Sequence, residues 1–317
     1  MSLKKGMPVI TGVALEPFTS DSIDDRQKTI NGVLQKFKNK RSCLGVSGRT
    51  VCVRYISLTL ANEQELHQAL VFEADKYIPF EVDEVYIDGQ NIMPYPESGE
   101  AEEIRVMLVC VKKDSVEVTA SNAISCGLTP AIVDVEAFAL GNALEAQRIA
   151  ESSHTEAATA CVDVGFLKTT VNIVKNGCSH FSREVYTGSG DFITGIESRL
   201  GVDTEMAKQL LLEPGPDEEQ IDDIISTVFE DIGSEVKMAI EFFESQYDEE
   251  VSDILVCGGG ALTRKIMELF SSSLEKHVLR WDPFKSFNLE NVDLDDFGEQ
   301  RSQFAIAIGL AARVLEV

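Results

Sequence analysis

Two glycine-containing turns in the second half of the chain constrain its fold more than any other feature. The first follows an apolar run and reads Asp163-Val164-Gly165-Phe166-Leu167-Lys168-Thr169-Thr170. The second, Gly258-Gly259-Gly260-Ala261, separates the apolar run 254–257 from a helical pattern. A glycine after a strand lets the backbone turn sharply or approach a ligand closely. Two such turns, with a helical block between them, predict an α/β fold in which both turns face one cleft.

The first turn combines residue types that can bind a phosphate group. Backbone N–H groups near Gly165 and the hydroxyls of Thr169 and Thr170 can donate to phosphate oxygens. Asp163 is an acceptor suited to a magnesium-bound water. A plain β-hairpin whose acid faces solvent accounts for the same residues equally well. The turn alone therefore leaves both a phosphate site and a simple hairpin open.

The second turn suits the nucleoside end of a nucleotide. Its three glycines, Gly258, Gly259 and Gly260, let a flat base or an α-phosphate lie against the backbone, beside the N-terminus of the following helix. Arg264 and Lys265 follow, in what we expect to be the first helical turn, where cations oppose the helix dipole unless an anion is near. A turn required only for packing is the alternative. The sequence contains neither a Walker loop nor a GxGxxG fingerprint.

Alternating strand and helix patterns predict a two-lobed α/β protein with an insertion. A helix over 62–77 ends at Ile78-Pro79-Phe80, because the residue before a proline is pushed out of the α region. The small, polar stretch 151–158 predicts the main lobe boundary. We therefore expect a first lobe of 1–61, 131–155 and 302–317, an inserted α+β subdomain at 62–130, a second-lobe core of 156–200 and 251–301, and a helical subdomain at 201–250.

Several local expectations accompany this division. A strand is expected over 8–18, and Asp114 is expected to cap a helix. A hairpin-like connection is expected at 94–103, and a long helix over 217–247 is expected to be interrupted at Gly233.

Charge and composition narrow the function classes. The 53 acidic and 28 basic residues give a formal net charge of -25. This charge repels nucleic-acid phosphates and anionic lipid headgroups, which excludes nucleic acid as a partner and favours a basic protein segment or a metal-chelated nucleotide. The seven cysteines form no CxxC pair and suit a reducing cytoplasm, and the four histidines are too scattered to predict a metal site. No run reaches the ~20 apolar residues that span a bilayer.

With these residues in hand, the chain resembles the PilM family of type IV pilus assembly, actin-like cytoplasmic relatives of the cell-division protein FtsA. The most specific segment is Glu73-Ala74-Asp75-Lys76-Tyr77-Ile78-Pro79-Phe80, in the inserted subdomain. The resemblance covers nearly the whole chain and continues through Val85, Asp88, Val109–Lys113, Gly127-Leu128, Val133–Leu140, Phe181–Glu184, Gly188–Gly190, Thr194 and Phe304–Arg313.

The resemblance implies an actin-like (ribonuclease H-like) fold with an inserted subdomain of the FtsA/PilM (SHS2) type. It implies that Asp163, Gly165, Thr169 and Thr170 lie on the phosphate side of an ATP-magnesium site and that the residues 258–260 lie on its nucleoside side. It also implies a scaffold that binds the cytoplasmic N-terminal peptide of a PilN-like inner-membrane protein, together with other pilus assembly proteins. Such a protein is cytoplasmic and reaches the membrane through its partner.

Three departures from the family pattern weaken the expected ATP chemistry. No first phosphate loop precedes Val9, so the chain is either truncated or lacks that loop. The stretch 207–211 reads Ala-Lys-Gln-Leu-Leu where the family carries an acid and a lysine for the ribose and base. Lys265 stands where the family tends to have glycine. Each lost charge-assisted hydrogen bond costs roughly 1.5–3 kcal/mol. We therefore expect weak or lost ATP binding and at most a weak ATPase, and we assign no catalytic residue.

Two other functions remain open at this point. The first is an active, filament-forming ATPase of the FtsA type, although the apolar helix that ends at Val317 does not resemble the basic membrane helix of FtsA-like proteins. The second is a kinase of the sugar-kinase branch, which needs a first phosphate loop and a catalytic acid that we do not find.

Overall fold

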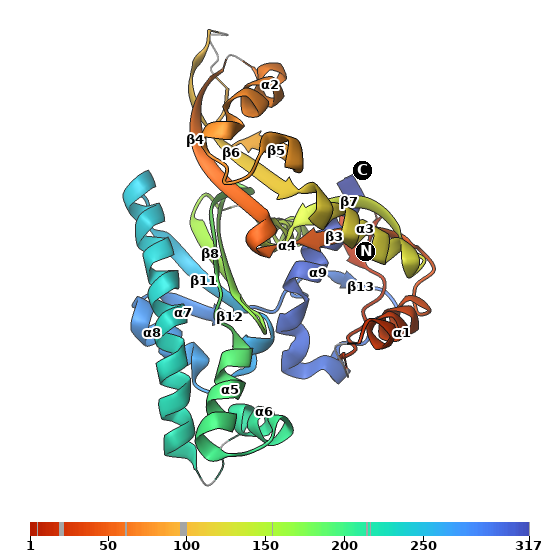
Figure 1. Cartoon of the computed structure of the whole chain (residues 1–317), viewed down its shortest axis with the longest axis vertical. Helices are drawn as coiled ribbons and strands as arrows, with labels where there is room; N and C mark the ends of the chain where they lie inside the picture. Colours follow the sequence, from red (N-terminus) through yellow and green to blue (C-terminus); the bar gives the residue numbers. More distant parts are fainter. Residues whose placement is uncertain are drawn as a thin grey trace. The chain divides into compact units, whose positions relative to one another are not determined.

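The computed structural model divides the chain into two units (Figure 1). It describes residues 1–4, 6–18, 22–60, 62–95, 100–153, 155–213, 215 and 217–316. The first unit comprises residues 1–136, 288–292 and 310–317, and the second comprises 137–287 and 293–309. Part of the expected connection at 94–103, residues 96–99, lies outside the described residues.

Two small sheets and two helices form one part of the first unit. The strands β1 (Ser2–Lys4) and β2 (Met7–Ile10) pair antiparallel, and β13 (Asn288–Leu289) pairs parallel with β2. A separate parallel pair joins β3 (Arg41–Val46) to β7 (Thr129–Val135). The strand expected over 8–18 ends at Ile10, where its pairing with β13 also ends. The helices of this part are α1 (Ile23–Leu34) and α3 (Lys113–Ser125).

An antiparallel sheet with one covering helix forms the rest of the first unit. Its strands are β4 (Val51–Leu60), β6 (Glu102–Lys112) and β5 (Val85–Asn91), in that spatial order, and α2 (Glu63–Glu73) packs on one face. Leu66 and Leu70 of α2 are buried there. A Cβ atom at Gly89 would lie 2.5 Å from Leu70 Cδ1, so the glycine lets α2 approach β5. Asp114 lies in the first turn of α3 and is not its cap, because Lys112 occupies the N-cap position.

The second unit is built on a five-stranded mixed sheet in the order β10-β9-β8-β11-β12. The strands β8 (Ala158–Val164), β9 (Thr169–Lys175) and β10 (Cys178–Val185) form an antiparallel meander. The strands β11 (Val251–Cys257) and β12 (His277–Arg280) run parallel to β8. The carboxyl ends of β8, β11 and β12 therefore lie at one edge of the sheet, where ligands of open α/β sheets commonly bind.

Helices complete the core of the second unit. They are α4 (Glu136–Glu151), α5 (Ser189–Leu200), α6 (Thr204–Leu212), α7 (Glu218–Tyr247), α8 (Ile266–Leu274) and the first part of α9 (Ala305–Arg313). The division between the units passes through two of them, since residue 136 and residues 310–313 belong to the first unit. The helix α7 runs without a break through Gly233, so the expected interruption there is wrong. A Cβ atom at this position would lie 2.7 Å from the Phe229 ring, and the glycine makes room for that side chain. None of the described helices is long and apolar enough to cross a membrane.

Candidate functional site

The two glycine turns that the sequence singled out lie side by side. Asp163 in β8 is the parallel partner of Cys257 in β11, so both turns leave the sheet at the same edge. A Cβ atom at Gly258 would lie 2.5 Å from the carbonyl oxygen of Val164 and 2.6 Å from Asp163 Oδ1. The turns therefore contact each other directly, and close packing between them is one reason for glycine at position 258.

Backbone hydrogen bonds hold the first turn, between β8 and β9. The Gly165 N–H donates to the carbonyl oxygen of Lys168 at 2.9 Å. At the start of α5, the Ser189 N–H donates to the Gly165 carbonyl (2.8 Å) and the Gly190 N–H to the Phe166 carbonyl (2.9 Å). Leu167 at the tip is 77% exposed. The N-terminus of α5 is thus occupied by the turn itself.

The two threonines assigned to the phosphate side are buried in β9. Thr169 and Thr170 have relative exposures of 0% and 1%. The Thr169 hydroxyl donates to the Thr187 carbonyl oxygen at 2.8 Å, which ties β9 to the segment that leads into α5. The Thr169 hydroxyl is thus bonded within the protein, and both threonine side chains are shielded from solvent in this structure.

Asp163 is half-buried and accepts a weak hydrogen bond from Cys257, whose Sγ lies 3.6 Å from Oδ1. Burial, with a smaller contribution from the Asp163 charge, raises the pKa of the Cys257 thiol well above its ordinary value. Within the part of the chain that the structure describes, no three His, Cys, Asp or Glu side chains gather in a metal-binding arrangement. A magnesium contact through water at Asp163 stays a prediction.

The three glycines of the second turn have different surroundings. Gly258 has a φ of +87° and donates its N–H to the Ser302 carbonyl at 3.0 Å. A Cβ atom at Gly260 would lie 2.3 Å from Val164 Cγ1. Gly259 is exposed, and the nearest atom to a Cβ there is Gln303 Oε1 at 3.8 Å. Packing therefore requires glycine at 258 and 260, whereas 259 is the position at which a ligand could meet the backbone.

The sequence predicts an anion near Arg264 and Lys265, and in the structure this anion is a side chain of the same chain. Both side chains pair with the carboxylate of Asp222 in α7. They also precede α8 instead of lying in its first turn, and Lys265 is the N-cap with a φ of +60°. This left-handed conformation favours glycine, the residue that the resemblance predicts at this position.

The stretch 207–211, which departs from the family pattern, packs into the core of the second unit. It lies in α6, where Ala207 and Leu211 are buried. Lys208 points to Glu205 on its own helix, at 2.7 Å. The carbonyl oxygen of Leu211 accepts from the Arg264 N–H at 3.1 Å. This part of α6 thus supports the segment after the second turn, and its described contacts are structural.

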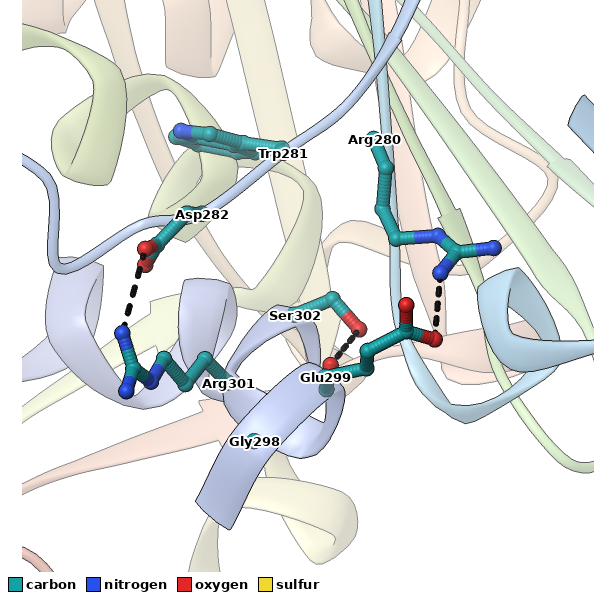
Figure 2. Close-up of a pocket in the computed structure, with 7 residues that line it drawn as sticks. All are labelled: Arg280, Trp281, Asp282, Gly298, Glu299, Arg301 and Ser302. Carbon is teal, nitrogen blue, oxygen red and sulfur yellow. Dashed lines mark hydrogen bonds and ion pairs between the residues drawn. The ribbon is translucent and has the colours of Figure 1, made fainter. Parts of the chain in front are cut away.

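A pocket beside the second turn was not anticipated from the sequence (Figure 2). It encloses about 380 Å³ and is joined to the turn through Ser302, whose hydroxyl donates to the Gly258 carbonyl at 3.3 Å. Its charges are matched: Arg280 pairs with Glu299 at 2.6 Å, and Arg301 lies 3.9 Å from Asp282. The seven lining residues are Arg280, Trp281, Asp282, Gly298, Glu299, Arg301 and Ser302. The only sequence signal for this pocket is the run Arg280-Trp281-Asp282, which begins at the last residue of β12.

Comparisons with known proteins identify a family and a fold. A family model described as "Type IV pilus assembly protein PilM" matches residues 2–315. A chain of the solved "PilM-PilN type IV pilus biogenesis complex" superposes with a TM-score of 0.81 at 23% identity, covering 96% of this chain and 88% of that chain. More distant matches include the ethanolamine utilization protein EutJ from Carboxydothermus hydrogenoformans (TM-score 0.45, 18% identity, 63% and 61% of the two chains). Another is MreB 5 of Spiroplasma citri bound to AMPPNP (TM-score 0.45, 16% identity, 65% of each chain).

Proposed function

Because this chain belongs to the type IV pilus assembly protein PilM family, we propose that it is a scaffold at the cytoplasmic face of a type IV pilus or secretion platform. It has the actin-like α/β fold expected from the sequence. In this role it binds the N-terminal peptide of a PilN-like inner-membrane protein and reaches the membrane through that partner. The family match over residues 2–315 carries the proposal, and the solved PilM-PilN complex with the same fold supports it.

Electrostatics also favour this kind of partner. A chain with a formal net charge of -25 attracts basic segments and repels acidic ones. Complementary charge mainly raises the association rate and excludes wrong partners, while apolar contacts supply most of the affinity. We therefore propose a partner peptide that combines apolar residues with a few basic ones.

ATP binding is weak or lost in this proposal. The buried hydroxyls of Thr169 and Thr170 and the occupied N-terminus of α5 support weak phosphate binding. The exposed backbone at Gly259 supports some remaining contact with a nucleoside. Asp163, Gly165, Thr169, Thr170 and the glycines 258–260 remain the proposed nucleotide-side residues. When bound, magnesium-ATP would bring a polyphosphate to this sheet edge, and any hydrolysis would be slow.

The proposed scaffold function is tested with a peptide titration. A fluorescently labelled N-terminal peptide of the PilN-like protein encoded in the same genome is titrated with the full chain, and anisotropy is recorded with and without magnesium-ATP. Saturable binding is expected with the natural peptide, and a scrambled peptide of the same composition separates sequence recognition from charge attraction. If the natural and scrambled peptides bind equally, or neither binds, the scaffold proposal is wrong.

The nucleotide part is tested separately by calorimetry with magnesium-ATP. We expect a dissociation constant near or above the millimolar range, roughly -4 kcal/mol or weaker. Micromolar binding, appreciable hydrolysis, or sedimentable filaments on nucleotide addition would instead support an active ATPase of the FtsA type.

A further inference from the structure

Two cations directly after the second turn hold the same carboxylate. Arg264 Nη2 donates a hydrogen bond to Asp222 Oδ1, and Lys265 Nζ donates one to Asp222 Oδ2. The Arg264 guanidinium also donates to the Glu218 carbonyl oxygen at 2.8 Å. Asp222 thus receives both cations on its two oxygens, in the way that a bound phosphate or carboxylate would.

The setting is costly unless an anion is present. Arg264 and Asp222 have side-chain exposures of only 9% and 18%, so neither charge is well solvated by water. Lys265 is the N-cap of α8, and its ammonium group cannot accept a hydrogen bond from the N–H groups of the first helical turn. These N–H groups form the positive end of the helix dipole and favour a negative charge nearby. The hydrogen bond to Asp222 raises the pKa of Lys265. The two cations and the helix terminus together favour a bound anion, and the acids already near them besides Asp222 are Glu218, 3.6 Å from Arg264 Nη1, and Glu268 in the first turn of α8.

We propose that Arg264 and Lys265 form an oxyanion-binding pair beside the second glycine turn, and that Asp222 occupies this pair as an internal carboxylate. By occupying it, Asp222 lowers the affinity of the turn for phosphate-bearing ligands. The inference rests on the proposed weak nucleotide binding and names a residue responsible for it. It does not depend on binding of the PilN-like peptide.

Arg264 is held by contacts that do not involve the Asp222 carboxylate. Its backbone N–H donates to Leu211 at the end of α6, and its guanidinium donates to the Glu218 carbonyl. Removing the Asp222 charge should therefore leave the guanidinium near its present place. Arg264 and Lys265 would then face one remaining carboxylate, that of Glu218, whose Oε1 lies 3.6 Å from Arg264 Nη1, and one positive charge would be uncompensated. An external oxyanion can then take the vacated position.

The test replaces the carboxylate with an amide of the same shape. Asp222→Asn is compared with Asp223→Asn, which removes an equal charge from the next residue of α7, where the backbone carbonyl accepts from Thr227. Thermal unfolding of the full chain is followed while inorganic phosphate replaces chloride at constant ionic strength. We expect Asp222→Asn to lower the Tm in chloride by roughly 5 °C and phosphate to restore it saturably. The wild type and Asp223→Asn should not respond.

Two further arms keep the proposal falsifiable. The double variant Asp222→Asn with Arg264→Gln lacks the guanidinium and should lose the phosphate response. Magnesium-ATP should bind Asp222→Asn at least about tenfold more tightly than the wild type. Tighter binding of magnesium-ATP than of inorganic phosphate identifies a nucleotide as the source of the oxyanion.

If Asp222→Asn folds only poorly in chloride, its refolding yield with phosphate becomes the readout, and recovery is expected. Equal phosphate responses of the 222 and 223 variants, or no response and no recovery, would overturn the proposal, whereas the peptide titration would be unaffected.

Discussion

The turn between β8 and β9 and the turn after β11 end neighbouring strands of one sheet, and they differ in what holds their backbone. The first is fixed by hydrogen bonds from the start of α5, so its carbonyls at 165 and 166 already have partners. The second is fixed by packing of Gly258 and Gly260 against the end of β8, while Gly259 stays exposed. The backbone carbonyls of the first turn are therefore already bonded within the protein, whereas the second turn keeps one backbone position, Gly259, exposed.

This difference shows that glycine serves separate purposes in one motif. Gly258 is needed for its positive φ and for contact with Asp163, and Gly260 for contact with Val164. Lys265 has a left-handed backbone with no glycine to relieve it, and its side chain holds Asp222. The motif of three glycines thus contains two positions at which packing requires glycine and one, Gly259, at which it does not.

The largest effect is expected at the contact between the turns. Gly258→Ala places a Cβ atom 2.5 Å from the Val164 carbonyl and keeps a left-handed φ, so it should destabilise the chain by about 3 kcal/mol. Urea unfolding with and without the substitution measures this. A loss below about 0.5 kcal/mol would mean that the two turns can separate freely.

A smaller loss is expected in the first turn. Thr169→Val removes the hydroxyl that donates to the Thr187 carbonyl and should cost about 1–2 kcal/mol in the free energy of unfolding. The same urea titration applies, with ATP calorimetry on the variant as a second measurement. Unchanged stability with reduced ATP binding would show that the hydroxyl serves a ligand instead of the fold.

A gain is expected at the end of the second turn. Lys265→Gly removes a left-handed non-glycine residue, and this relief should exceed the loss of its exposed ion pair. The Tm should rise by roughly 1–3 °C in differential scanning calorimetry. A lower Tm would show that the pairing with Asp222 outweighs the backbone strain.

The smallest effect on stability is expected at Gly259. Gly259→Ala meets no atom within 3.8 Å and should change the free energy of unfolding by less than about 0.5 kcal/mol. Because it leaves the fold intact, it is the matched partner of Gly258→Ala for measuring nucleotide contact. Any ATP binding that Gly259→Ala abolishes must come from this exposed backbone. Destabilisation equal to that of Gly258→Ala would show that packing constrains both positions alike.

Some of these features were predictable from the residues. The pattern at 73–80 and the two turns identified the family and its fold, both of which are confirmed. The adjacency of the turns followed from their position after two apolar strands. The four-part lobe division and the nucleotide roles of the seven site residues remain predictions. The predicted break at Gly233 was wrong. Glycine is required there by the neighbouring Phe229 ring and does not interrupt the helix.

The sequence by itself determined the family, the order of strands and helices, the acidic character and the position of both turns, because these depend on local patterns and composition. Only the tertiary structure decided which groups in those turns are available to a ligand. The Thr169 hydroxyl donates to the Thr187 carbonyl oxygen and is therefore engaged within the protein. Arg264 and Lys265 pair with the carboxylate of Asp222, which lies about forty residues earlier in the chain. Hydrogen bonds and ion pairs of this kind depend on which distant elements pack together, and no local pattern of residues specifies that.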